Sequence, residues 1–249
     1  MFEVAQVRGK HHLFGYVNCD IILLDDFTAA INRVCLDRFL VVGQRWDLDL
    51  GEPVDFGANW VAYLRRLIKQ KGVIHPPAGS DYFVFPRGLF RHIPPFAVGR
   101  VAWDNWMIQY CLSTKIPVVD ATHAITVIHQ NHEPYSHTHF VGGKVVGPES
   151  ERNLTLAPSS RRITLVHANW LMLPAGLRPK KSLRYHLQTF IIMPVINPRF
   201  YGWLRPLAWI LRKCLGQADR RLNGRQWMPD EWTDYQALVS AETDPGTTL

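Results

Sequence analysis

Two polar side chains follow an apolar run near the start of the chain. The run Leu13–Val17, interrupted only by Gly15, is typical of a buried strand, and Asn18 and Asp20 come directly after it. Residues spaced i, i+2 on an extended chain share a face, so an amide oxygen and a carboxylate would lie side by side. Such a pair at the end of a strand suits a hard divalent cation and the polar end of a nucleotide. The alternative is that Asp20 caps a following helix.

This stretch resembles the metal-binding motif of glycosyltransferases with the nucleotide-diphospho-sugar (GT-A) fold. The motif of that family is an apolar strand, Asp-x-Asp, a few apolar residues and Asp-Phe. Here Asn18 stands in place of the first Asp, and Asp26-Phe27 matches the final pair. The resemblance implies that Asp20 binds Mn²⁺ or Mg²⁺, that Asn18 contacts the donor, and that the donor is a nucleotide-sugar.

A second segment is similar to the loop on the acceptor side of these enzymes. It begins Gly79-Ser80-Asp81 and runs into an apolar stretch and an Arg-containing turn. The resemblance implies that Gly79 lets the backbone approach a sugar closely, because glycine lacks a Cβ. It also implies that Asp81 accepts hydrogen bonds from sugar hydroxyls. The alternative is an ordinary loop with a capping Asp.

A third segment, Trp103-Asp104-Asn105-Trp106, resembles the point in inverting, family-two-like enzymes where an acid begins a helix beneath the acceptor. The resemblance implies that Asp104 is the general base and that Trp103 and Asn105 contact donor or acceptor. Two structural alternatives stay open. Helix electrostatics favour a carboxylate at this position, and a buried Trp usually belongs to a core.

Four histidines lie within eleven residues, at positions His129, His132, His137 and His139. By residue type alone they predict a transition-metal site, although Pro134 interrupts the segment. In some GT-A enzymes a His at the end of a strand completes the cation site. That resemblance implies that His129 is the second metal ligand and that His132 contacts the diphosphate or the acceptor.

The chain departs from the family before Asn18. GT-A domains normally hold the nucleoside base on two βαβ-type units of about 30 residues each, whereas 17 residues precede Asn18 here. We therefore expect an incomplete, Rossmann-like GT-A core over residues 1–175, shortened at its N-terminus or completed by another chain.

Composition and periodicity predict one α/β core. The 249 residues are 47% hydrophobic, which is enough for one sizeable core, and strand-length apolar runs alternate with stretches of helical spacing. The second expected helix should end at Gly72, which tolerates a left-handed backbone. The expected helices cover residues 26–36, 59–71 and 103–115, and the expected strands cover 13–17, 39–42, 117–119 and 124–128.

Several features are typical of a cytoplasmic protein. The four cysteines are scattered without a Cys-x-x-Cys pair, as expected of reduced thiols. Residues 1–10 hold no apolar signal core, and no run reaches the roughly 18 apolar residues that a membrane span needs. The formal charge of +7 favours anionic partners, but no nucleic-acid-binding motif is present.

Residues 176–249 form a basic, aromatic tail that we expect to be helical. Pro194, Pro198 and Pro206 should prevent one long helix. Aromatic residues and leucines mixed with basic side chains predict a segment lying in the interface of an anionic membrane, at the inner face. The alternative is that these apolar side chains pack on the core.

Together the four segments predict a metal-dependent, inverting hexosyltransferase. It would move a sugar from a nucleotide-diphospho-sugar to a hydroxyl of a glycan or a lipid-linked acceptor. One alternative is a non-catalytic GT-A remnant that acts as a binding module. The other is a His-rich metallohydrolase, which would lack the usual i, i+4 pair of helical metal ligands.

Overall fold

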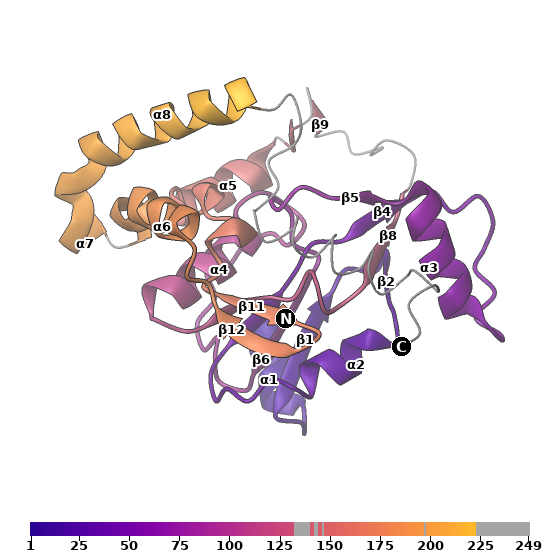
Figure 1. Cartoon of the computed structure of the whole chain (residues 1–249). Helices are drawn as coiled ribbons and strands as arrows, with labels where there is room; N and C mark the ends of the chain where they lie inside the picture. Colours follow the sequence, from indigo (N-terminus) through magenta and orange to yellow (C-terminus); the bar gives the residue numbers. More distant parts are fainter. Residues whose placement is uncertain (132–139, 142–143, 146, 197, 223–249) are drawn as a thin grey trace.

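The computed structural model describes residues 1–131, 140–141, 144–145, 147–196 and 198–222 (Figure 1). Within these residues the chain is an α/β protein whose mixed sheets are flanked by helices, as the alternation of apolar patterns predicts. Most strands of the chain belong to one of two larger sheets, and the chain passes repeatedly from one sheet to the other.

The larger sheet has six strands in the order β1-β6-β3-β7-β11-β12. β3 runs parallel to β7, and β7 parallel to β11, while the other neighbours are antiparallel. The sheet continues past residue 175, because β12 completes a hairpin with β11. The strands are β1 (Leu13–Val17), β3 (Leu40–Val42), β6 (Tyr82–Pro86), β7 (Val118–Asp120), β11 (Trp170–Leu173) and β12 (Gly176–Pro179).

Helices cover both faces of the larger sheet, so its central strands are apolar on both sides. Leu40 and Val42 of β3 pack into one core cluster with α4 and α6, whereas Val41 points into a second cluster with α2. The alternation follows the two-residue period of a strand. The bounds of these helices are α2 (Asp26–Ile31), α4 (Trp103–Ser113) and α6 (Leu183–Ile196).

The smaller sheet has four strands in the order β2-β8-β4-β5. Leu64 and Ile68 of α3 (Trp60–Lys71) pack against Leu48 and Ile128 of this sheet. The strands are β2 (Ile21–Leu23), β4 (Trp46–Leu48), β5 (Val73–Ile74) and β8 (Val127–Gln130).

The connections from β1 to β2, β2 to β3, β3 to β4, β5 to β6 and β7 to β8 all carry the chain between the two sheets. The connections pack tightly against each other. At Gly43 a Cβ atom would lie 2.4 Å from the hydroxyl of Tyr82 and 3.0 Å from the backbone nitrogen of Thr122. The polar residues that follow β1 and β3 are therefore brought together between the sheets.

The remaining elements surround this core. A two-stranded sheet pairs β9 with β10, and α8 lies over α6 at the outside of the molecule (Figure 1). No helix within the described part of the chain is long and apolar enough to cross a membrane. These elements are α1 (Phe2–Arg8), β9 (Phe140–Val141), β10 (Lys144–Val145), α5 (Pro148–Leu156), η1 (Ser160–Arg162), η2 (Leu165–His167), α7 (Pro198–Tyr201), η3 (Gly202–Leu204) and α8 (Arg205–Leu222).

Two expectations about helix ends are confirmed, although the local conformations differ from those expected. Gly72 ends α3 with φ −66° and ψ 138°, an extended conformation. Glycine is needed there because a Cβ would lie 2.7 Å from the carbonyl oxygen of Ile68. Pro194 lies inside α6 rather than breaking it, two residues before the helix ends. Pro198 is the first residue of α7 and Pro206 the second residue of α8, where a missing N–H costs little. The tail is therefore divided into separate helices, as expected.

Candidate functional site

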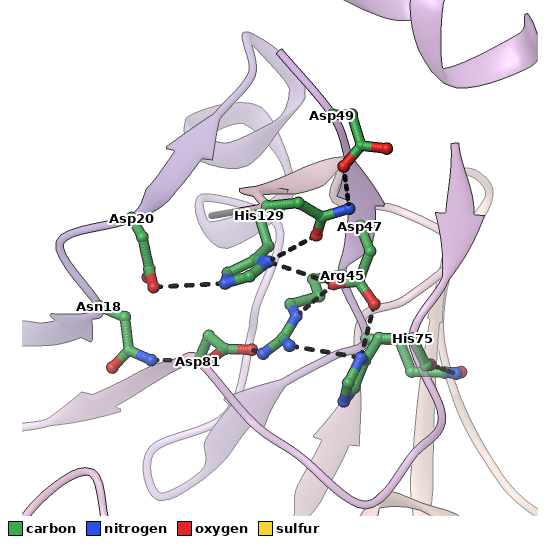
Figure 2. A network of polar contacts seen from close by, with 10 residues as sticks. Asn18, Asp20, Arg45, Asp47, Asp49, His75, Asp81 and His129 are labelled. Carbon is green, nitrogen blue, oxygen red and sulfur yellow. Dashed lines mark hydrogen bonds and ion pairs between the residues drawn. The ribbon is translucent and has the colours of Figure 1, made fainter. Parts of the chain in front are cut away.

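A continuous network of charged and amide side chains fills the space between the two sheets (Figure 2). Its members come from segments that are far apart in the sequence and meet only because the chain crosses between sheets there. Asp20 follows β1, Arg45 precedes β4, Asp81 precedes β6, and His129 lies on β8.

His129 lies between two carboxylates. Its Nε2 is 3.3 Å from Oδ2 of Asp20, and its Nδ1 is 3.3 Å from Oδ1 of Asp47. Oδ1 of Asn131 also lies 3.3 Å from Nδ1. The hydrogen bond with Asp47 raises the pKa of His129 above its ordinary value, against the opposing effect of burial. The imidazole is therefore held in one orientation, with Nε2 turned to Asp20.

Arg45 joins this histidine to the second half of the network. Its guanidinium is paired with Asp81, and its Nε lies 2.8 Å from Oδ1 of Asp47. Burial disfavours the charge of Arg45, but the two carboxylates outweigh that effect and raise its pKa. Burial likewise opposes ionisation of Asp47, yet hydrogen bonds with His129, His75 and Arg45 hold its pKa far below the usual range. Asp47 is thus ionised at neutral pH.

His75 closes the network on the other side of Asp47. Its Nδ1 lies 2.7 Å from Oδ2 of Asp47 and 3.3 Å from Nη2 of Arg45. The ring also lies beside Gly79, where a Cβ would be 3.2 Å from Nε2 of His75. The space next to Gly79 is therefore occupied by an imidazole of the same chain.

Asn18 connects the network to the end of β1. Its amide donates to Oδ1 of Asp81 at 2.6 Å and its oxygen accepts from the hydroxyl of Tyr16 at 2.6 Å. Both oxygens of Asp81 thus have partners within the protein. Burial, together with the charges of Asp81, Asp20 and Asp104 among others, raises the pKa of Tyr16 to about 12. The phenol consequently stays protonated and remains a hydrogen-bond donor.

Asp104 lies in the first turn of α4. Burial raises the pKa of its carboxyl to about 6, although the backbone N–H groups of Asn105 and Ser80 hydrogen bond to it. The Tyr16 ring meets Trp103 edge-on, with centroids 4.9 Å apart. A carboxyl group that titrates near neutral pH is therefore held close to the polar network by packing around Tyr16.

Two residues predicted to contact substrate are buried in the core. Trp103 is 5% exposed and packs against the rings of Phe2, Tyr16 and Phe83. Asn105 is buried and donates to the carbonyl oxygen of Ile163 at 2.6 Å. The burial of Trp103 matches the alternative in which a buried Trp belongs to the core. His132 lies outside the described residues.

Asp20 and His129 have the chemistry and the spacing of two ligands of one cation. Neighbouring ligands of an octahedral ion with bonds of about 2.1 Å lie about 3 Å apart, close to the 3.3 Å between Oδ2 and Nε2. Metal-bound histidines usually donate their other N–H to a carboxylate, as Nδ1 does here with Asp47. Within the described ranges, however, no group of three or more His, Cys, Asp or Glu side chains could hold an ion by itself. Further ligands would have to come from substrate or water.

Several residues of the network were not expected from the sequence, notably Arg45, Asp47 and His75. The sequence does contain one indication that Arg45 and Asp47 lie together. Arg45, Asp47 and Asp49 alternate after an apolar strand, so on an extended chain they share a face. Asp49 in turn accepts a hydrogen bond from Asn131 at 2.8 Å. No sequence signal pairs His75 with this face, because that contact depends on how β5 joins the small sheet.

Comparison with known proteins adds no identification. No protein-family description, curated protein or solved structure matches the chain.

Proposed function

We propose that this chain is a glycosyltransferase-like protein that uses a nucleotide-diphospho-sugar donor. The observation that carries the proposal is the contact between Asp20 and His129, with Asp47 behind the imidazole. These two residues come from motifs 109 positions apart in the sequence, and each motif independently resembles a cation-binding segment of the GT-A family. The strand–Asn-x-Asp segment and the strand-end histidine are neighbours, as that resemblance requires.

The donor would bind with its diphosphate over Asp20 and His129. A divalent cation bound there would neutralise the diphosphate as it leaves. Asp47 and Asn131 would keep the Nδ1 proton of His129 in place, so that the lone pair of Nε2 faces the site. Arg45 would hold Asp47 and Asp81 in their positions. The raised pKa of His129 means that a proton competes with the cation for Nε2.

Asp104 would act as the general base. With a pKa of about 6, its carboxylate is mostly ionised at neutral pH and can accept the proton of the acceptor hydroxyl. The hydroxyl oxygen would then bond to the anomeric carbon while the bond from that carbon to the diphosphate oxygen breaks. Because this is a single displacement, the configuration at the anomeric carbon would invert.

Calorimetric titration of the full chain with Mn²⁺, alone and with a panel of nucleotide-diphospho-sugars, tests the proposal. We expect weak cation binding that a matching donor strengthens, and loss of both in Asp20→Asn and in His129→Ala. Asp37→Asn and His92→Ala change exposed residues away from the site and serve as matched controls.

Three results would contradict the proposal. The first is a folded chain that takes up neither cation nor donor. The second is equal binding by site variants and controls. The third is tightly held zinc, which would instead favour a metallohydrolase. Donor binding without release of the nucleoside diphosphate would favour the non-catalytic binding module.

A further inference from the structure

The positive charge of the chain is concentrated in one segment. Residues 152–218 contain eleven Lys and Arg and no Asp or Glu, which is a charge of +11. The rest of the chain has the remaining 17 basic residues against 21 acidic ones, which is −4. The net +7 of the whole protein therefore comes entirely from this segment, which ends in the C-terminal helices.

Those helices form the outermost layer of the molecule (Figure 1). Ile192 of α6 is buried in the core cluster beneath the large sheet, and α8 packs over α6 with Ala208 buried between them. One face of α8 is thus used by the fold. The opposite face has no partner among the described elements.

The segment formed by α7, η3 and α8 exposes several large apolar side chains. Trp203 is 76% exposed, Phe200 70% and Trp209 53%. Leu207 and Ile210, one helical turn apart, are also about half exposed. We call these five residues, with the exposed Arg205, Arg212 and Lys213, the α7–α8 surface. These five exposed large aromatic and aliphatic side chains, all within residues 200–210, mark an interaction site rather than ordinary surface.

The basic residues of this surface are interleaved with its aromatic residues. Nζ of Lys213 lies 4.0 Å from the centre of the Trp209 ring. The ammonium group and the indole are therefore neighbours on the surface. Trp is enriched where a membrane meets water, and Lys and Arg are attracted to anionic headgroups. An amphipathic helix with these two classes of residue is suited to lie in the plane of a membrane interface.

Other partners fit the surface less well. A second copy of the chain, related by a two-fold axis, would bring the same positive charges face to face. A nucleic acid would satisfy the basic residues but would leave Leu207 and Ile210 without an apolar counterpart. A bilayer that contains anionic lipid satisfies both the charge and the apolar area.

We propose that the α7–α8 surface binds the interface of an anionic lipid bilayer, with Trp203 and Trp209 inserted among the headgroups. This goes beyond glycosyl transfer and stands whether or not the chain has that activity. If the proposed transferase activity also holds, this surface would place the site beside a lipid-linked acceptor.

Co-sedimentation of the full chain with vesicles tests this proposal. We expect binding to phosphatidylcholine vesicles that contain phosphatidylglycerol, weaker binding to phosphatidylcholine alone, and weaker binding at high salt. The triple variant Arg205→Gln, Arg212→Gln, Lys213→Gln should lower the partition coefficient by about 100-fold, or about fivefold for each basic residue. The variant Trp203→Ser, Trp209→Ser should lower it by about tenfold or more.

Matched controls come from α3 and the loop before it. Arg66→Gln, Lys69→Gln, Lys71→Gln removes three exposed charges, and Phe56→Ser removes a ring that is 61% exposed. Both should bind vesicles like the original chain. Equal binding by the surface variants and the controls would overturn the proposal, as would absence of binding by the folded protein. A dimer that the surface variants dissociate, or binding of duplex DNA in place of vesicles, would also overturn it.

Discussion

At the scale of single residues, the Asp104 carboxylate that we propose as the general base also destabilises the folded protein at neutral pH. Its carboxyl is desolvated at the start of α4, and its pKa is raised from 3.8 to about 6. The folded protein therefore binds the Asp104 proton more tightly than the unfolded chain does. The favourable contribution is complete below about pH 3.8 and is lost as the pH rises through about 6.

We expect Asp104→Asn to be more stable than the original chain at pH 8, and much less active. The rise in the pKa of Asp104 from 3.8 to about 6 corresponds to about 3 kcal/mol in the free energy of unfolding, and the gain should shrink below pH 5. The Asn oxygen can still accept from the N–H of Ser80. Loss of a general base should lower turnover by about 10²–10⁴-fold with donor affinity retained.

Urea unfolding at pH 5 and pH 8, beside pH profiles of turnover, checks both parts of this prediction. In the original chain the rate should rise with pH through about 6. Unchanged turnover in Asp104→Asn would rule out the catalytic assignment. A variant that is less stable at pH 8 would show that the carboxylate is not desolvated as described.

At the scale of elements, the site depends on the connections between the two sheets. Arg45 follows β3 and reaches both Asp81, before β6, and Asp47, on β4. Its side chain is 11% exposed. Loss of one partner from a buried ion pair destabilises the fold, because the carboxylates that stay buried are then neither solvated nor paired.

Arg45→Met should therefore lower the free energy of unfolding by about 3 kcal/mol. The chain contains a useful control in Arg65, whose side chain is 41% exposed and pairs with Asp25 and Asp26. Arg65→Met should cost about 1 kcal/mol or less, because exposed ion pairs contribute little. Chemical denaturation of the two variants under the same conditions makes the comparison. Similar losses would mean that Arg45 does not hold the connections together.

At the scale of the whole molecule, the C-terminal helices are not an independent appendage. Ile192 of α6 belongs to the same core cluster as Leu40 of β3 and Met107 of α4. The sheet itself extends to β12, beyond the boundary expected at residue 175. The sheet and α6 should consequently unfold together.

Ile192→Ala should lower the free energy of unfolding by about 2–5 kcal/mol, as expected for a buried large-to-small change. The shift should appear equally in far-UV circular dichroism and in tryptophan fluorescence, because one core is affected. Ile210→Ala, on the exposed face of α8, should change stability by about 0.5 kcal/mol or less. Separate transitions for the two probes would show instead that the helices unfold on their own.

The sequence by itself predicted the elements whose signals are local. The apolar run of β1 and the helical spacing of α3 and α4 appear almost at their expected bounds. The alternation of these elements was sufficient to predict an α/β protein. Motif order also led us to expect that Asp20 and His129 act together, and the structure places them 3.3 Å apart. Their role as cation ligands stays a prediction.

Tertiary structure decided which polar residues share the site. Arg45 and His75 belong to the network because of the strand order and the points where the chain crosses between sheets, and neither is encoded in local periodicity. The same packing turned Trp103 and Asn105 inward, away from the substrate roles expected of them. A motif specifies residue type and spacing along the chain, but the partners of a side chain are set by contacts between elements distant in sequence, and these exist only once the sheets have formed.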